Sequence, residues 1–134
     1  MSDRANIYLE MPGEDDQPSG IYLYTHYYGR EWPEMLREAL EFGRGRWNDE
    51  QYLARIIISR VFADLTDSEL GGGVSLRIGD NNHPIIVCDL IKREVSFSTN
   101  GGERDCWVRR SHLSFVDYVK QDRADYPPNF DAED

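Results

Sequence analysis

The sequence predicts an α+β fold, in which an antiparallel sheet of about five strands packs with two central helices and a short C-terminal helix in the order β-β-α-α-β-β-β-α. Short β-branched and aromatic segments lie between glycine and proline turns, two consecutive central segments have apolar residues at helical spacing, and the strands occur in hairpins. The length suits one modest core, so we expect a single domain over residues 1–134 with flexible tails at about residues 1–4 and 122–134.

Five segments are predicted to be strands because β-branched and aromatic side chains favour extended structure. They are residues 6–10, 21–28, 74–78, 85–90 and 94–98. The segment MPGEDDQPSG is predicted to be a loop after the first strand, and GDNNHP and LIKRE are predicted to be hairpin turns between the last three strands. The dipeptide Trp-Val at 107–108 is a candidate extension of the sheet.

Three segments are predicted to be helices. The first begins at Pro33, which suits the first helical position, and ends before Gly43. The second has Asn48 as its N-cap, two acidic residues in the positive first turn, and a largely apolar face that continues to about residue 63. The third is a short closing helix over residues 112–120.

The net charge of −10 is concentrated at the two ends of the chain. Residues 21–60 contain six arginines and six acids and are locally neutral. A strongly acidic protein opposes nonspecific binding to nucleic acid, so we expect no direct nucleic-acid partner. The sequence contains no apolar run long enough to span a membrane and no secretory signal, and its two cysteines form no paired motif. We therefore expect a cytoplasmic protein.

Rings gather on one face of the second predicted strand. Side chains alternate along a strand, so Tyr22, Tyr24, His26 and Tyr28 point to the same side. Such a face could be a stacking platform for a nucleotide base or a tyrosine-rich protein interface. It could equally pack under the helices or lie on the solvent side of the sheet, and the sequence leaves these alternatives open.

Two arginines, Arg44 and Arg46, flank a glycine just before Trp47. Guanidinium groups bind phosphate through paired hydrogen bonds, and helix N-termini attract anions. However, Asp49 and Glu50 occupy the first turn of the next helix and would repel a phosphate. The alternative is an ordinary helix-helix turn in which the arginines pair with these acids.

The second helix carries two further arginines. Arg60 is spaced to form a salt bridge with Asp64, whereas Arg55 is the freer of the two. The candidate ligand-binding residues are therefore the rings and cations of this central region. They are Tyr24, His26, Tyr28, Arg30, Arg44, Arg46, Trp47 and Arg55.

The sequence offers little support for catalysis or for a cofactor. The histidines and cysteines lack metal-ligand spacing, and no nucleophile motif or phosphate-binding loop is present. His83 is most simply a turn residue, and Cys88 a small core residue. We therefore expect no metal, no cofactor and no catalytic residue.

The pattern YLYTH-x-x-G, followed by a helix and by R-W-x-D-x-x-Y-L-A-R-I-I, spans much of residues 20–98. In this pattern the chain resembles a family of small uncharacterised proteins from phages and bacterial mobile elements. The family has no established activity, so the resemblance implies no residue roles. It implies only an accessory protein that acts in the cytoplasm of a bacterial host cell.

Two hypotheses of function follow. In the first, the protein counters a bacterial host defence without catalysis, by binding and sequestering a nucleotide-derived signal. The rings would stack on the base and the arginines would neutralise phosphate, and we expect a homo-oligomer because a small domain has little room for a deep pocket. In the second, acidic surfaces inhibit a host defence protein directly. An unrecognised hydrolase or transferase is the least favoured alternative.

Overall fold

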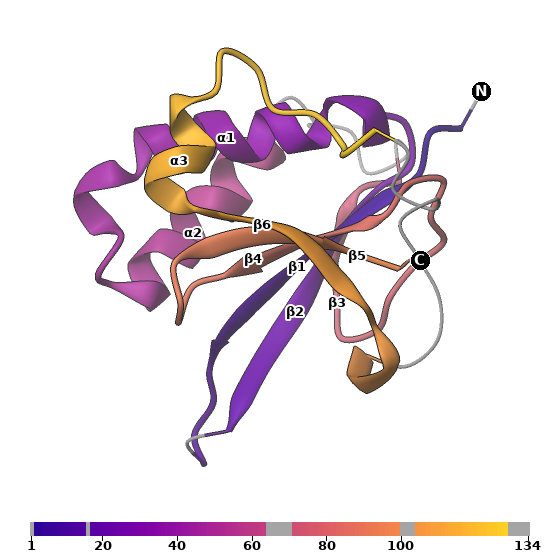
Figure 1. Ribbon diagram of the computed structural model, residues 1–134. Coiled ribbons are helices and arrows are strands. Elements are labelled where there is room, and N and C mark those ends of the chain that lie inside the picture. The colour runs from indigo at the N-terminus through magenta and orange to yellow at the C-terminus, as the bar shows by residue number, and fades with distance from the viewer. Residues whose placement is uncertain (1, 16, 64–70, 100–103, 129–134) are drawn as a thin grey trace.

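The computed structural model describes residues 2–15, 17–63, 71–99 and 104–128. In these residues a six-stranded sheet packs against three α-helices, which all lie on one face of the sheet (Figure 1). The α+β prediction is therefore confirmed, with one more strand than expected.

The strand order in the sheet is β3-β2-β1-β4-β5-β6. The strands are β1 (Ala5–Pro12), β2 (Pro18–Thr25), β3 (Gly73–Ser75), β4 (Ile85–Asp89), β5 (Glu94–Ser98) and β6 (Arg109–Ser114). The prediction of a purely antiparallel sheet is wrong for one pair, because β1 and β4 are parallel. Two helices and β3 lie between β2 and β4 in the sequence, and a long connection of this kind lets β4 lie parallel to β1.

The helices are α1 (Trp32–Phe42), α2 (Glu50–Val61) and α3 (Phe115–Lys120). Helix α1 has Pro33 in its first turn, as predicted. The side chain of Asp49, rather than that of Asn48, caps α2 by accepting a hydrogen bond from the amide of Tyr52. Short 3-10 turns precede α1 (η1, Gly29–Glu31) and α2 (η2, Arg44–Arg46), and a third, η4 (Arg104–Cys106), precedes β6.

The main core lies between the helices and the sheet. Its fully buried residues come from both layers and include Ile7, Leu9, Leu23, Ile86, Cys88 and Val95 from the strands, and Trp32, Leu36, Leu40, Leu53, Ile57 and Phe115 from the helices. Cys88 is completely buried, and burial raises the pKa of its thiol. It is therefore the small core residue that the sequence indicated.

Strand β2 lies three residues earlier than predicted. Ser19 and Gly20 pair with β1, whereas the chain turns after Thr25, whose hydroxyl accepts a hydrogen bond from the amide of Tyr28. A side-chain oxygen that binds a backbone amide three residues later stabilises a turn. The strand propensity of the aromatic residues at 27–28 is overridden by this turn.

The end of the sheet also differs from the prediction. Residues 112–114 belong to β6, and α3 begins only at Phe115, because the hydroxyl of Ser114 accepts a hydrogen bond from the amide of Asp117. Strand β6 is irregular, with a register shift opposite Val95–Phe97 and a positive φ of 58° at Ser111. Because of this irregularity, the apolar and polar residues of β6 do not alternate as they do in a regular strand, and the sequence pattern did not indicate the whole strand.

The segment after α3 packs on the molecule, although residues 122–134 were expected to be a flexible tail. Ala124 is buried and its amide donates to the carboxylate of Glu34 over 2.8 Å. Arg123 pairs with Glu31 over 2.6 Å. These contacts involve residues 123 and 124, whereas residues 129–134 lie outside the described part of the chain.

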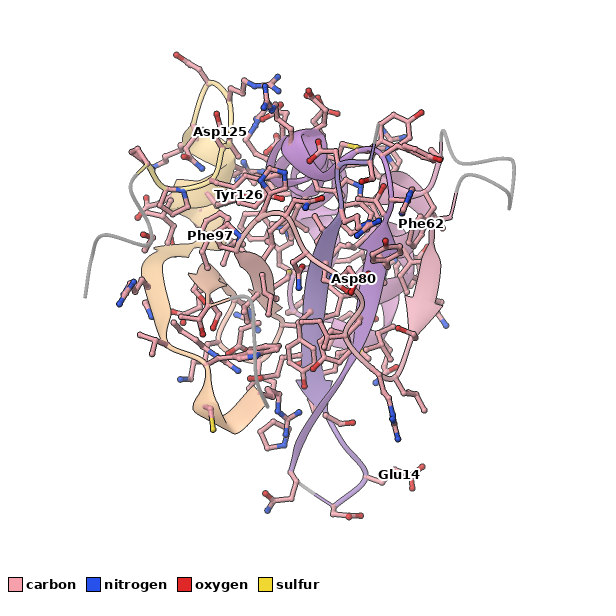
Figure 2. All side chains as sticks on the ribbon, turned by 90° about the vertical axis from the view of Figure 1, so that its right-hand side faces the viewer. Glu14, Phe62, Asp80, Phe97, Asp125 and Tyr126 are labelled. Carbon is pink, nitrogen blue, oxygen red and sulfur yellow. The ribbon has the colours of Figure 1, made fainter. Side chains whose placement is uncertain are left out.

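Asp3, which falls in the predicted N-terminal tail, makes contacts with two distant segments. Asp3 binds Nε2 of His83 over 2.5 Å and the amide of Arg30 over 2.8 Å. Burial by itself would raise the pKa of Asp3, but these two hydrogen bonds lower it. The ring of Tyr126 stacks on His83 at 4.5 Å, and its hydroxyl donates to the carbonyl of Gly29. In Figure 2, Tyr126 lies beside Phe97.

The pair formed by Glu34 and Arg37 fastens the C-terminal segment to α1 and generates a pH prediction. The guanidinium of Arg37 forms two hydrogen bonds with Glu34, at 2.7 and 2.6 Å, and lowers the pKa of that carboxyl. Because the pKa of Glu34 is lower in the folded state than in the unfolded state, ionised Glu34 stabilises the fold at pH values above its unfolded pKa of 4.5. This stabilisation is lost as the pH falls through the pKa that Glu34 has in the folded state.

We expect Glu34→Gln to lower the free energy of unfolding by about 1–2 kcal/mol at neutral pH. The difference from the wild type should shrink as the pH falls below about 4.5. Urea unfolding at a series of pH values measures it. Glu38→Gln, which removes an exposed carboxylate from the same helix, is the control. A difference that stays constant down to pH 3 would contradict the role given to this pair.

Candidate functional site

The face of the sheet that no described helix covers carries a second buried cluster. We call it the sheet-face cluster, and it consists of Tyr8, Tyr22, Ile85, Val87 and Trp107. Tyr8 and Tyr22 are direct cross-strand partners in β1 and β2, and Val87 lies beside Tyr8 in β4. Side chains alternate along β1, so Ile7 and Leu9 enter the main core while Tyr8 between them points to this second face.

The three rings of the sheet-face cluster pack against one another. The ring centroids of Tyr8 and Tyr22 are 5.0 Å apart, and the indole of Trp107 stands edge-on to both, at 5.5 and 6.2 Å. Tilted and edge-on rings at these separations attract each other. Burial raises the pKa of both phenols, so each keeps its proton at neutral pH and can donate a hydrogen bond.

Two arginines near the end of the chain reach this face. The guanidinium of Arg104 lies 5.6 Å from the centroid of the Tyr8 ring and donates a hydrogen bond to its hydroxyl. Arg109 pairs with the largely buried carboxylate of Glu10 over 2.9 Å. The cluster therefore has cationic groups beside proton-bearing phenols.

A turn covers another part of the same face. The side chain of Asn6 is fully buried and binds residues 79–81 through its amide and its carbonyl, with a shortest contact of 2.8 Å to the Asn81 side chain. Gly79 in this turn lies against the ring of Tyr24. The tyrosine face is thus neither under the helices nor fully open to solvent, because segments outside the helices frame it.

Between these covers lies a pocket of about 330 Å³ lined by Tyr8, Pro18, Ser19, Gly20, Tyr22, Leu76 and Arg104. These described residues supply a guanidinium, two phenols, a serine hydroxyl and strand backbone, but no carboxylate, imidazole or thiol. Hydrogen-bond donors beside aromatic faces suit an anion with a planar part. The lining thus suits the binding of an anion, and it lacks the groups that usually act as an acid–base pair.

One buried polar group of the sheet-face cluster lacks a partner. The indole nitrogen of Trp107 is buried without an acceptor among the residues that the structure describes. Buried donors in folded proteins are normally satisfied, so this nitrogen is an exception in the cluster. Tyr22, which is 8% exposed, lines the pocket itself.

The residues that the sequence predicted as a binding site fall in three places. Tyr24 and His26 lie together near the end of β2, joined by a 3.0 Å hydrogen bond between the phenol oxygen and Nδ1. Tyr24 lines a second pocket with Gly71–Gly73, Arg77 and Gly79. This pair is on the helix-free face, next to the sheet-face cluster.

Tyr28 and Arg30 lie beyond the strand, before α1. Tyr28 is about one-third exposed, and strand alternation no longer places it with Tyr24, because the chain turns after Thr25. The amide of Arg30 is held by Asp3. The two residues therefore belong to the junction between β2 and α1.

The other four predicted residues lie at the opposite end of α1, where it meets α2. The indole of Trp47 donates to the carbonyl of Leu40 over 2.9 Å and its ring packs on Phe115, so it has a structural role. Arg44 pairs with Glu41 over 2.6 Å, rather than with the acids of α2. The guanidinium groups of Arg46 and Arg55 lie over the ring of Tyr52, and the partner expected for Arg60, at position 64, lies outside the described residues.

The structure therefore does not bring the eight predicted residues into one site. Helix α1 has 11 residues and a length of about 16 Å, which separates Arg30 from Arg44. Tyr24 and His26 lie on the other side of the sheet from the helices. The residues that do converge on the pocket, above all Tyr8 and Arg104, are 96 positions apart, and no local spacing signalled their meeting.

Two further features bear on the kind of site. In residues 2–15, 17–63, 71–99 and 104–128, no group of three or more histidine, cysteine or acidic side chains is placed to hold a metal ion. Among the same residues, no helix has the length and apolar character needed to cross a bilayer.

The protein therefore has an α+β fold in which helices cover one face of the sheet and the other face carries a polar pocket with aromatic side chains in its lining. No protein-family model matches the chain, and neither a curated protein nor a solved structure is significantly similar to it.

The packing of Tyr8 depends on Gly20, which yields a stability prediction. A Cβ atom at position 20 would lie 2.6 Å from Cζ of Tyr8 and 2.3 Å from the carbonyl oxygen of Leu9. We expect Gly20→Ala to lower the free energy of unfolding by about 1–3 kcal/mol, because the ring and the strand must move apart.

Gly45→Ala is the matched control, since a Cβ atom there meets nothing within 4 Å. It should change the stability by less than about 1 kcal/mol. Urea unfolding of both variants measures the difference. If the two substitutions have equal effects, the ring of Tyr8 does not pack across Gly20 as described.

Proposed function

We propose that this protein binds a small nucleotide-derived anion without transforming it, at the pocket beside the sheet-face cluster. The observation that carries the proposal is the convergence of the Arg104 guanidinium with the phenols of Tyr8 and Tyr22 on one polar pocket. Guanidinium groups bind phosphate oxygens through two parallel hydrogen bonds. Proton-bearing phenols can donate to the same oxygens.

The size and the walls of the pocket also support this class of ligand. Its volume of about 330 Å³ is at the lower end of the range for small-molecule sites. The ring of Tyr22 and the largely exposed side chain of Leu76 offer apolar surface for a planar base. The neighbouring pocket at Tyr24 and Arg77 lies along the same strand and can receive a second part of a longer ligand.

Sequestration is the biological role that we propose for this binding. The lining has no carboxylate, imidazole or thiol among the described residues, which favours retention of the ligand over its conversion. In the phage or mobile-element context that the sequence resemblance implies, the protein would lower the free concentration of a signal nucleotide in the cytoplasm of a bacterial host and so counter its defence. Direct inhibition of a host protein through an acidic surface is the alternative.

Thermal denaturation with a panel of linear and cyclic nucleotides tests the proposal. A nucleotide that binds only the folded state raises the midpoint, and mass spectrometry after heating should recover it unchanged. We expect Tyr22→Phe to weaken binding about tenfold, because it deletes one hydrogen bond and keeps the ring. Arg104→Gln should weaken it further, because a bond to a charged group is lost.

Lys120→Gln on α3 is the control, because Lys120 is exposed on the helix-covered side of the sheet, and its substitution should leave nucleotide binding unchanged. A panel in which no nucleotide raises the midpoint, or variants at Tyr22 and Arg104 that bind as the wild type does, would refute this site. A stable complex recovered from a host lysate under those circumstances would favour the inhibitor instead.

A further inference from the structure

The exposed side of α2 carries aromatic rings covered by arginines. We call it the α2 arginine patch, and it consists of Phe42, Arg46, Tyr52, Arg55, Ile56 and Arg60. The guanidinium of Arg60 lies 4.4 Å from the centroid of Phe42, and those of Arg46 and Arg55 lie 4.3 and 5.3 Å from that of Tyr52. Phe42 is 65% exposed and Tyr52 39%. Five of these six residues, all but Arg46, line a shallow hollow of about 380 Å³ together with Ser59.

The charges of the patch are not neutralised locally. Arg46, Arg55 and Arg60 have no carboxylate within ion-pair distance among the described residues, whereas Arg37 and Arg44 on the neighbouring helix and turn are each paired. The patch is therefore a basic, aromatic surface on a protein whose net charge is −10. Arginine, tyrosine and phenylalanine are the side chains that are enriched where proteins bind each other.

A projecting acidic element on the same chain has the complementary charge. Strand β1 pairs with β4 only as far as Glu10, and β3 pairs with β2 only at Tyr22–Tyr24, so the β1–β2 hairpin extends beyond the sheet (Figure 1). Figure 2 shows Glu14 at its tip, away from the body of the molecule. Glu14 and Asp15 are exposed, and neither forms an ion pair with a described residue.

We propose that the acidic hairpin tip of one copy docks on the α2 arginine patch of a second copy, and that the contact is repeated across a two-fold axis to form a dimer. Each copy supplies one tip and one patch, so a two-fold arrangement uses both and closes. The carboxylates of Glu14 and Asp15 meet guanidinium groups already positioned by the rings of Phe42 and Tyr52. Nucleic acid, the other common partner of arginines, is disfavoured by the net charge of the chain.

Sedimentation velocity and light scattering of the full chain test the proposal. The wild type should form a dimer at low ionic strength and dissociate at about 1 M salt, where the screening length is about 3 Å. Arg55→Glu with Arg60→Glu should weaken dimerisation at least about tenfold, because two attractive pairs become repulsive. Glu14→Lys with Asp15→Lys should do the same.

The decisive measurement is a mixture of the two charge-reversed variants. In the mixed dimer one contact pairs lysines with glutamates and the other pairs the native carboxylates with the native arginines, so the mixture should dimerise although neither variant does alone. Lys92→Glu with Lys120→Glu is the control for the arginine variant, because it makes the same change in net charge as Arg55→Glu with Arg60→Glu, at exposed lysines elsewhere. That control should dimerise as the wild type does.

Circular dichroism and thermal melting confirm that each variant is folded. The proposal is overturned by a wild type that is monomeric at low ionic strength, by charge-reversed variants that dimerise normally, or by a mixture that stays monomeric. A control variant that loses dimerisation to the same extent also overturns it, because net charge rather than this contact would then be responsible.

Discussion

Strand β1 is buried on both of its faces, and the rest of the structure is assembled on it. Residues 5–10 are all buried. Ile7 and Leu9 pack in the core under the helices. On the other face, Asn6 binds the turn at residues 79–81, Tyr8 packs in the sheet-face cluster, and Glu10 forms a salt bridge with Arg109. A strand in the middle of a sheet must satisfy its backbone on both sides, and β1 does so with an antiparallel and a parallel neighbour.

The two faces of the sheet differ in the segments that cover them, and the long connection that makes β1 and β4 parallel accounts for the difference. The connection that leads from β2 back to β4 contains both long helices, which cover one face, and then β3 and the turn at residues 79–81, which lies on the other face. The opposite face is left to short segments that contain glycine, asparagine and arginine. Polar groups therefore come to lie beside buried rings on that face, which is the combination that a binding pocket needs.

The elements with strong local signals could be predicted from the sequence, and those set by long-range contacts could not. Helices α1 and α2 and strands β4 and β5 were predicted with small errors because apolar periodicity and turn residues define them locally. The predicted second strand was displaced because the local turn between Thr25 and Tyr28 overrides the strand propensity of residues 27–28, and because the packing of Tyr8 over Gly20 depends on tertiary structure. Half of β6 was assigned to the last helix because its irregular pairing obscures the alternation.

The candidate site was harder to predict from the sequence than the fold, because its residues come together only through long-range contacts. The sequence drew attention to the tyrosines of β2 and to the arginines around α2, and the structure keeps both groups but places them on opposite sides of the sheet. The partners that complete the pocket are Tyr8, which resembles an ordinary strand residue, and Arg104, which lies in an unremarkable turn. Only the sheet topology brings them to Tyr22.

The stack of Tyr126 on His83 links the two sides of the molecule. His83 follows the turn that Asn6 clamps on the pocket face, and Tyr126 belongs to the segment that closes the helix layer. Opening either segment breaks the same stack, so the free energies of local opening on the two sides are thermodynamically linked. A ligand that tightens the pocket face would thereby slow hydrogen exchange in a segment on the far side of the sheet that it never touches.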